Sequence, residues 1–352
     1  MEHVYMGIDV GKKFCFFCVL NEEGERIELS QVPTLDAAAW RKLLVRFQDV
    51  ELHVCFEIGT HYEWMYDLLR NFAVDVQVVN PEAFALIARS QKKTDKIDCQ
   101  KLAEGLRRGD LPVVYVPEKR VREDRRLAAH IHALSRLSTS VKNRIRNLLF
   151  MARLECKYTS LERPGAIRWL KEIALPTLGH TDRLILNMLL EQLELIAAQQ
   201  QQIEKTVQER LKDYSDVTLV RSIPGFGPLV SLSVLCAIAE IGRFETPDQL
   251  ASYFGLCGRT YQSGASLYQG NITKRGNKHV RWLLGQAVTL LIRADPKARA
   301  RYMKLRRKKR PKIARVALMR WMSTVLWRMM KSREEYRING VAGAYRRKKE
   351  AA

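Results

Sequence analysis

The sequence has little that would place it in a membrane or in an oxidising compartment. No uninterrupted apolar run approaches the roughly 20 residues that cross a bilayer, and the N-terminus lacks the basic and apolar regions of a signal peptide. Cysteine is sparse and odd in number, with seven residues at no repeated spacing, which argues against a disulfide framework. The sequence therefore predicts a cytoplasmic protein in a reducing compartment, without a membrane partner.

A zinc-binding cysteine motif is also not expected. Cys15 and Cys18 form a Cys-x-x-Cys, but they lie in a strongly β-like run, where a spacing of three directs the two thiols to opposite faces. No second pair is present to complete a four-ligand zinc site. We expect both thiols to be buried in the core.

Acidic residues are too few to balance the basic ones. The 352 residues include 60 Lys and Arg against 38 Asp and Glu, a formal net charge of +22. Such an excess attracts polyanions and releases counterions when phosphates are contacted, so nucleic acid is the leading partner. A ribosomal protein or a membrane-surface binder would share this charge.

The imbalance is greatest near the C-terminus. No acidic residue occurs between Pro296 and Arg333. This stretch contains the basic run Arg306, Arg307, Lys308, Lys309 and Arg310. A solvated helix usually balances its charges, so we predict a surface that follows phosphates, with Trp321 and Trp327 packed into the core.

The first third of the chain predicts a mixed sheet. Strands are expected at residues 4–10, 14–20, 25–31, 52–57 and 74–80, and helices at 35–47 and 62–71. Three strands, a helix, a strand, a helix and a strand build an RNase H-like sheet in this order. A further helix is predicted over residues 96–107, entered through Thr94 and Asp95.

The remainder is predicted to be helical. Long helical patterns over residues 124–149 and 181–211 favour two helices that pair across a loop or a dimer interface. A second compact unit begins near Val217 with a helix-hairpin-helix turn, in which the N–H groups around Gly225 and Gly227 either hold a phosphate or have only a structural role. The predicted class is α/β plus α. Its domains are an RNase H-like domain over 1–120, coiled-coil helices over 121–215, a compact domain over 216–295 and basic helices over 296–352.

Four carboxylates stand out because of where these elements would place them. Asp9 ends the first strand and Glu57 ends the fourth, and these two strands are neighbours in an RNase H-like sheet. Asp95 and Asp98 are three residues apart, so they share one face of the following helix. Taken singly, each is explained as a turn residue or a helix N-cap. Together they predict a site for divalent cations, because two-metal phosphodiester chemistry uses clustered carboxylates.

Motifs in both halves of the chain occur in the order of one known family. The N-terminal motifs are Gly7–Val10, Phe56–Gly59, Val79–Pro81 and Lys93–Ala103, and the C-terminal ones are Ile223–Gly227, Phe244, Ala251–Leu256, Gln262–Gly264 and Ile272–Arg281. With these motifs the chain resembles the DEDD transposases of the insertion-sequence one-ten group, which are recombinases guided by a bridge RNA. The N-terminal motifs are similar to the RuvC-like domain of that family and the others to its transposase domain.

The resemblance implies a reaction and the residues that carry it. Asp9, Glu57, Asp95 and Asp98 would bind Mg²⁺, as two ions. Ser263 matches by position the serine that attacks DNA to give a covalent phosphoserine intermediate. The hydroxyl of Ser266, in the same polar loop, is the alternative nucleophile.

The resemblance also implies the partners. These are double-stranded donor and target DNA, a structured bridge RNA, and further copies of the chain in a dimer or tetramer whose site is assembled between subunits. Such a protein would work on the nucleoid of a bacterium or archaeon. Besides Gly225, Gly227 and residues 306–310, contacts to phosphate are expected from Lys274, Arg275 and Arg281.

Three other functions stay open on the sequence. A plain RuvC-like nuclease would use water as its nucleophile and give no covalent adduct. A tyrosine recombinase would use Tyr261 or Tyr268, but His279 and Arg281 have the wrong spacing for its His-x-x-Arg pair. A binding scaffold would have no reason to tolerate clustered carboxylates beside phosphates. We therefore expect cut-and-join recombination of a mobile element.

Overall fold

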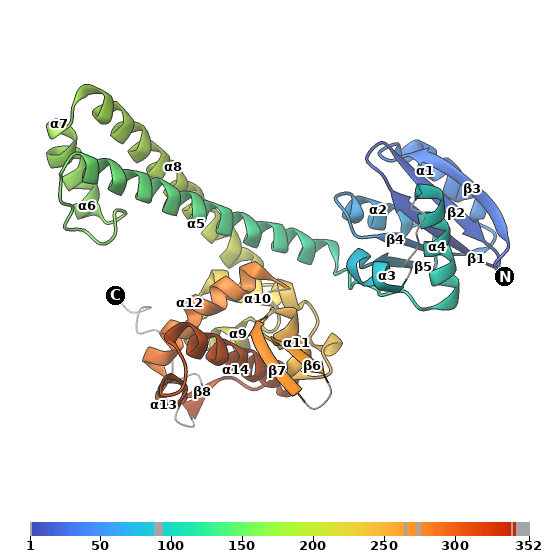
Figure 1. Ribbon diagram of the computed structural model, residues 1–352. Coiled ribbons are helices and arrows are strands. Elements are labelled where there is room, and N and C mark those ends of the chain that lie inside the picture. Colours follow the sequence, from blue (N-terminus) through green and yellow to red (C-terminus); the bar gives the residue numbers. More distant parts are fainter. Residues whose placement is uncertain (1, 88–93, 264–265, 273–275, 339–340, 343–352) are drawn as a thin grey trace. The chain divides into compact units, whose positions relative to one another are not determined.

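The chain folds into two compact units. The computed structural model describes residues 2–87, 94–263, 266–272, 276–338 and 341–342. Contacts between residues divide it into Met1–Val116 and Pro117–Ala352, whose elements are labelled in Figure 1. In the part of the chain that is described, no helix is long and apolar enough to cross a membrane.

A five-stranded mixed sheet forms the centre of the first unit (Figure 1). Its strands are β1 (His3–Val10), β2 (Phe14–Leu20), β3 (Arg26–Pro33), β4 (Glu51–Glu57) and β5 (Asp75–Val79), in the order β3-β2-β1-β4-β5. The pairs β1–β2 and β2–β3 are antiparallel, and β1–β4 and β4–β5 are parallel. All five predicted strands are confirmed, and the sheet is consistent with an RNase H-like domain.

Helices cover both faces of this sheet. On one face, Met6 and Ile8 of β1 are buried together with Trp40 of α1 (Ala37–Leu44) and Met65 of α2 (Tyr62–Leu69). On the other face, α4 (Asp95–Arg108) packs over Cys55 of β4. Two short helices, Val45–Phe47 and α3 (Pro81–Ile87), complete the unit. The strands thus have apolar side chains on both faces, as expected for a sheet covered on both sides.

The thiols of β2 separate as the strand alternation predicts. Cys15 belongs to the cluster beneath α1 and α2, and Cys18 belongs to a cluster with Cys99 and Ala103 of α4. Both are fully buried. The prediction that they pack in the core on opposite faces is confirmed.

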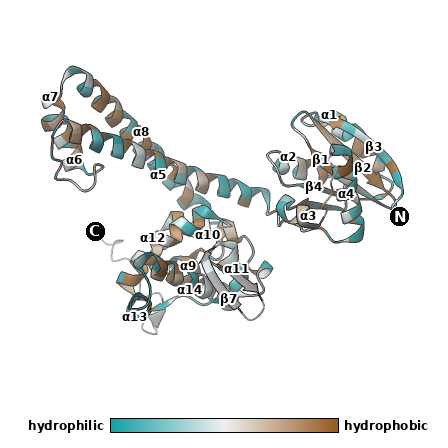
Figure 2. Ribbon diagram, in the orientation of Figure 1, coloured by the Kyte–Doolittle hydropathy of each residue, from teal (hydrophilic) through white to brown (hydrophobic). Residues whose placement is uncertain are grey.

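Two long helices dominate the first part of the second unit. They are α5 (Lys119–Met151) and α8 (His180–Leu211), which pack against each other as predicted. Their contact contains Ile145 and Leu148 of α5 and Leu189 and Leu193 of α8. Figure 2 shows hydrophobic stretches along both helices, interrupted by hydrophilic ones. They are connected through α6 (Pro164–Trp169), a π-helical turn at Leu170–Ala174 and α7 (Leu175–Thr177).

The rest of the second unit is a helical core with small hairpins. Its helices are α9 (Val217–Arg221), α10 (Pro228–Ile238), α11 (Pro247–Tyr253), α12 (Lys278–Ala294), α13 (Pro296–Arg306) and α14 (Pro311–Ser332), with a 3₁₀ turn at Ile241–Arg243. A small two-stranded sheet pairs β8 (Arg337–Ile338) with β9 (Val341–Ala342). Trp321 and Trp327 pack against the core, as predicted.

The predicted polar loop around Ser263 is instead a β-hairpin, formed by β6 (Gly258–Ser263) and β7 (Ser266–Ile272). Tyr261 pairs with Tyr268, and Ser263 pairs with Ser266. The expectation of a loop was wrong because the aromatic and β-branched residues of this segment favour strands despite its polar composition. The two serines therefore occupy paired positions in the register of the hairpin.

Candidate acidic site and nucleic-acid interface

Asp9 and Glu57 stand at the ends of adjacent parallel strands. In the register of β1 and β4, Ile8 pairs with Phe56, and Asp9 and Glu57 are the next residues along the two strands. Ile8 and Phe56 are buried on the side of α1 and α2. Because side chains alternate along a strand, the carboxylates point to the other face, which is covered by α4. The structure therefore brings these two side chains to one edge of the sheet.

Helix α4 runs against β1 in the opposite direction. Tyr5 packs with Leu102 and Leu106. Two residues further along β1, Gly7 lies against Cys99 and Ala103, where an added Cβ would be 2.3 Å from the Cys99 carbonyl oxygen. As β1 advances, its contacts thus move back toward the start of α4. The first turn of α4 accordingly lies toward Asp9.

That first turn contains the other two carboxylates. Thr94 caps the helix, its hydroxyl accepting a hydrogen bond from the Ile97 amide at 3.4 Å, which confirms the predicted helix start. Asp95 and Asp98 follow in the first turn, Asp95 exposed and Asp98 partly buried. The helix dipole stabilises negative charge at this position. Four carboxylates from three elements thus gather toward one edge of the sheet.

The buried thiols beneath α4 are influenced by these carboxylates. Burial, together with the nearby Cys18 and the charge of Asp9, raises the pKa of the Cys99 thiol to about 12. Burial likewise raises the pKa of Cys55, with contributions from Asp75 and Glu57. Such thiols stay protonated at neutral pH while no metal is bound. The donors at the ends of β1 and β4 and in the first turn of α4 are carboxylate oxygens.

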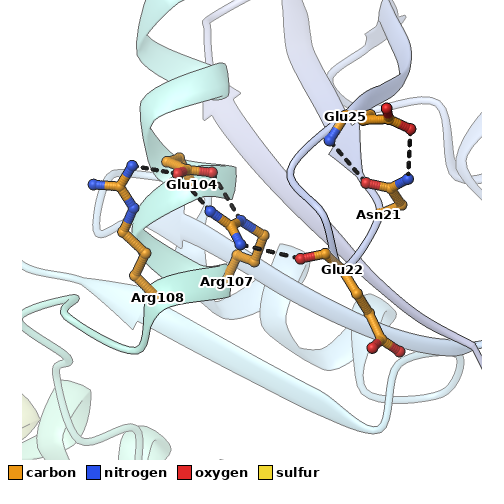
Figure 3. A network of polar contacts seen from close by, with 6 residues as sticks. All are labelled: Asn21, Glu22, Glu25, Glu104, Arg107 and Arg108. Atoms are coloured by element: carbon orange, nitrogen blue, oxygen red, sulfur yellow. Dashed lines mark hydrogen bonds and ion pairs between the residues drawn. The ribbon is translucent and has the colours of Figure 1, made fainter.

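The far end of α4 is held by a charged network, drawn in Figure 3. Glu104 accepts hydrogen bonds from Arg107 at 2.8 and 3.0 Å and pairs with Arg108. Arg107 also donates to the Glu22 carbonyl oxygen, at 3.0 Å, in the turn between β2 and β3. The hydrogen bonds from Arg107 lower the pKa of Glu104 to about 2. This network fixes the orientation of the helix that carries Asp95 and Asp98.

The carboxylates share an edge but are not drawn into a tight cluster. Among the residues that the structure describes, one group of three His, Cys, Asp or Glu side chains has ligand atoms all within 4.8 Å of one another, and it is His3, Glu51 and His53. No three of the four predicted carboxylates meet that limit. Wider spacing lowers the repulsion between like charges. Hard carboxylate oxygens are nevertheless the donors that suit Mg²⁺.

The predicted glycine turn in the second unit is present between α9 and α10. Gly225 has φ +94°, and an added Cβ would be 2.6 Å from the Ala287 carbonyl oxygen of α12, so close packing alone requires glycine there. Gly227 is the N-cap of α10, and a Cβ there would meet nothing within 4 Å. Of the two, Gly227 has the more open surroundings for a phosphate.

The predicted basic contacts differ in their surroundings. Arg281 donates a hydrogen bond to the Phe254 carbonyl oxygen at 3.1 Å, so part of its guanidinium supports the fold. Residues 306–310 are all exposed, around the junction of α13 and α14. Lys274 and Arg275 lie outside the described residues. The hairpin backbone places Ser263 at the end of β6.

The sequence did not predict a groove between α5 and α12. The groove has a volume of about 470 Å³ and is lined by His132, Arg136 and Asn143 of α5 and by Trp282 of α12, together with hydroxyl side chains. The rings of His132 and Trp282 are 4.5 Å apart, and Trp282 is 37% exposed. Arg136 and the accessible indole of Trp282 line the same groove. Such a combination of a cation and an aromatic ring is typical of surfaces on which bases stack. The only sequence signal was a row of polar residues on one face of a long helix.

His279 lies behind this groove. Its ring is 5.1 Å from that of His132, and its Nε2 is 3.2 Å from the hydroxyl of the buried Ser233. Burial, together with His132, lowers the pKa of His279 to about 4. Burial also lowers the pKa of His132 below its usual 6.5, so both histidines are neutral at pH 7 and the positive charge lining the groove comes from Arg136.

Two family models match the chain. One, described as a transposase of the DEDD type found in IS110, matches residues 6–152. The other, described as the transposase IS116/IS110/IS902 family, matches residues 217–303. The first match contains all four carboxylates, and the second contains both hairpin serines and the groove tryptophan.

Curated proteins are similar over most of the chain. The transposase for insertion sequence element IS1111A of Coxiella burnetii is 26% identical over 347 residues, covering 94% of this chain and 91% of that protein. A putative transposase, y4qE, of Sinorhizobium fredii is 27% identical, covering 80% of this chain and 70% of that protein. A probable family 20 transposase of Pseudomonas aeruginosa is 23% identical, with 79% and 83% covered.

Proposed function

Because this chain belongs to the IS110/IS116 family of DEDD transposases, we propose that it excises and inserts a mobile DNA element through a covalent serine–DNA intermediate. Membership of the family indicates an enzyme that cleaves and recombines DNA. The main structural support for the proposal is the shared sheet edge of Asp9 and Glu57, with the first turn of α4 directed toward it. The names of the relatives do not favour a plain RuvC-like nuclease.

The four carboxylates are the proposed metal ligands. Asp9, Glu57, Asp95 and Asp98 would hold two Mg²⁺ ions, for which an all-oxygen donor set is suitable. Bound there, the ions would supply positive charge to the phosphate in the transition state and lower the pKa of the attacking hydroxyl. The protein contributes the position of these donors: β1 and β4 fix two of them, and α4 fixes the other two.

Ser263 is the proposed nucleophile. A serine hydroxyl is weak at neutral pH, so it must be activated and its product charge stabilised. Ser263 ends β6 and pairs with Ser266 of β7, so the hairpin presents two hydroxyl-bearing residues at neighbouring positions. Ser266 remains the second candidate for the same step.

The proposed partners are donor and target DNA and a bridge RNA. The net charge of +22, the exposed residues 306–310 and the groove of Arg136 and Trp282 support binding of polyanions and of unstacked bases. Further contacts to phosphate are proposed for Gly225, Gly227, Lys274, Arg275 and Arg281.

We further propose that the chain acts as a dimer or tetramer. Several large apolar side chains on α5 and α8 are half or more exposed, which is unusual for a helix in contact only with water. They are Leu137, Phe150, Met151, Leu184, Met188 and Leu195. A second copy of the helix pair would cover them.

The proposed reaction is tested by trapping its intermediate. Full-length protein is incubated with donor and target DNA, guide RNA and Mg²⁺, and protein-linked strands are resolved on denaturing gels. Ser263→Ala should remove the adduct and Ser266→Ala should retain it, while Asp9→Asn should remove both adduct and recombination. An adduct that survives Ser263→Ala and is lost in Ser266→Ala would move the nucleophile to Ser266. Free DNA ends without any adduct would instead indicate attack by water.

A further inference from the structure

Three side chains of metal-ligating types converge at the edge of the first-unit sheet where β1 and β4 begin. In the parallel register of these strands, His3 pairs with Glu51 and Tyr5 pairs with His53. His3 Nδ1 is 3.1 Å from His53 Nε2 and 3.2 Å from Glu51 Oε2. All three ligand atoms lie within 4.8 Å of one another. They come from the two central strands, whose backbone positions are fixed by the sheet.

Hydrogen bonds among these three groups cannot satisfy all of them well. If His3 Nδ1 carries a proton, it donates that proton either to Glu51 or to His53. Its contact with the remaining partner is then not a hydrogen bond from His3. If His3 Nδ1 is bare, its lone pair faces the carboxylate oxygen of Glu51, and these two atoms repel each other. A cation between the three atoms would accept one lone pair from each of them.

Two of the three separations match neighbouring corners of a tetrahedral zinc site. Zn²⁺ binds imidazole nitrogen and carboxylate oxygen at about 2.0 Å, so two ligands at corners of a tetrahedron are about 3.3 Å apart. The separations at His3 Nδ1, 3.1 and 3.2 Å, are close to that value. Magnesium favours all-oxygen octahedral sites, whereas two imidazoles and one carboxylate suit zinc and its neighbours in the first transition series.

We propose that His3, Glu51 and His53 form a Zn²⁺ site that clamps the beginning of β1 to the beginning of β4. Water would complete the coordination, because the side chains of His3 and Glu51 are 40% and 38% exposed. The ring of Tyr5 stacks on His53, with centroids 5.2 Å apart and planes inclined by 17°, and so orients one ligand. The site is separate from the carboxylate edge, since the six residue steps of extended strand from His3 to Asp9 span about 20 Å.

The test must distinguish this site from the acidic one. Full-length protein with Asp9→Asn, Glu57→Gln, Asp95→Asn and Asp98→Asn is stripped with chelator and titrated with Zn²⁺ by calorimetry and with Co²⁺ by visible absorption. We expect one Zn²⁺ per chain and a Co²⁺ spectrum typical of nitrogen ligation. His53→Gln in the same background should weaken Zn²⁺ binding at least tenfold. His130→Gln, the same exchange on α5, is the matched control and should leave binding unchanged.

Thermal unfolding shows whether a loss of Zn²⁺ binding in the His53→Gln variant reflects a folding defect. Without metal, the chain with His53 should unfold at a slightly higher temperature than the His53→Gln variant, because the variant loses the stacking of Tyr5 on His53. Zn²⁺ should raise the unfolding temperature of the former alone. Equal Zn²⁺ affinity in both, or no Zn²⁺ binding in the background with intact His3, Glu51 and His53, would overturn the proposal.

Discussion

Gly7 of β1 lies against the main chain of α4, where an added Cβ would be 2.3 Å from the Cys99 carbonyl oxygen and 2.3 Å from the Ala103 nitrogen. Neither contact can be relieved by moving a side chain. Gly7→Ala should therefore separate β1 from α4 and lower the free energy of unfolding by about 3 kcal/mol. Because the first turn of α4 would move with the helix, the same variant should also lose recombination activity.

The matched control is Gly59→Ala, since a Cβ at Gly59 would meet nothing within 4 Å. Its effect on stability should stay within about 0.5 kcal/mol. Urea unfolding and hydrogen exchange of peptides from β1 and α4 measure both variants. Unchanged protection of α4 in Gly7→Ala would show that the helix does not depend on this close approach.

The ion pairs of Glu104 predict sensitivity to acid in the first unit. The pKa of Glu104 is lowered from 4.5 to about 2, mainly by its hydrogen bonds with Arg107. A carboxyl whose pKa is depressed in the folded state stabilises the fold above its unfolded pKa, and this contribution is lost as pH falls from about 4.5 to 2. Glu104→Gln should cost about 1 kcal/mol at pH 7, because the side chain is 28% exposed and the pair is partly screened by solvent.

Hydrogen exchange of α4 peptides between pH 7 and pH 3 measures this effect. In the unsubstituted chain, protection should fall over the acid range, and in Glu104→Gln it should start lower and fall less. Glu172→Gln, an exposed glutamate in the second unit, is the control and should leave α4 unchanged. Identical acid profiles for α4 in Glu104→Gln and the unsubstituted chain would contradict the assigned role.

Much of the first unit could be predicted because its local signals agree with its tertiary structure. The run Phe14–Leu20 is apolar and rich in phenylalanine and is bounded by polar turns, and its predicted bounds are those observed. Thr94 was identifiable as a cap because a hydroxyl before an acidic first turn is a local signal. The placement of Asp9 beside Glu57 followed from strand order, since neighbouring parallel strands end at the same edge of a sheet.

Other features depend on contacts that a local pattern does not contain. His3 and His53 are 50 residues apart, and their approach depends on the register of β1 with β4, which the sequence does not specify to the residue. The groove at Trp282 depends on how α12 packs on α5. The hairpin of β6 and β7 was missed because its polar residues hide the β-propensity of Tyr261 and Tyr268.

The groove between α5 and α12 should bind unpaired nucleotides. Stacking of a base on an aromatic ring contributes about 1–3 kcal/mol, so Trp282→Ala should weaken binding of single-stranded RNA by roughly tenfold or more. Arg136→Gln should weaken it less and should also reduce the dependence of binding on salt. Fluorescence anisotropy with labelled RNA and DNA oligonucleotides of the same sequence measures both effects.

Trp169→Ala is the control for loss of an indole, because Trp169 packs in the separate cluster beside α6. It should leave oligonucleotide affinity unchanged. The two oligonucleotides distinguish the source of the nucleotide: a larger loss for RNA assigns the groove to the guide, and a larger loss for DNA assigns it to a displaced strand. Unchanged affinity for both in Trp282→Ala would remove the groove from the binding surface.

The proposed oligomer predicts complementation between inactive variants. Asp9→Asn lacks a proposed metal ligand but keeps Ser263, and Ser263→Ala has the opposite defect. If the carboxylates of one subunit act with the serine of another, a mixed dimer contains one intact pair. After random mixing in equal amounts, half of the dimers are mixed, so adduct formation should return to about a quarter of the unsubstituted level.

The assay is the denaturing gel for protein-linked DNA, after the variants are refolded or expressed together. A double variant carrying both changes, mixed with the unsubstituted chain, controls for subunit exchange. Complete inactivity of the Asp9→Asn and Ser263→Ala mixture, with exchange demonstrated, would mean that each subunit uses its own carboxylates and serine.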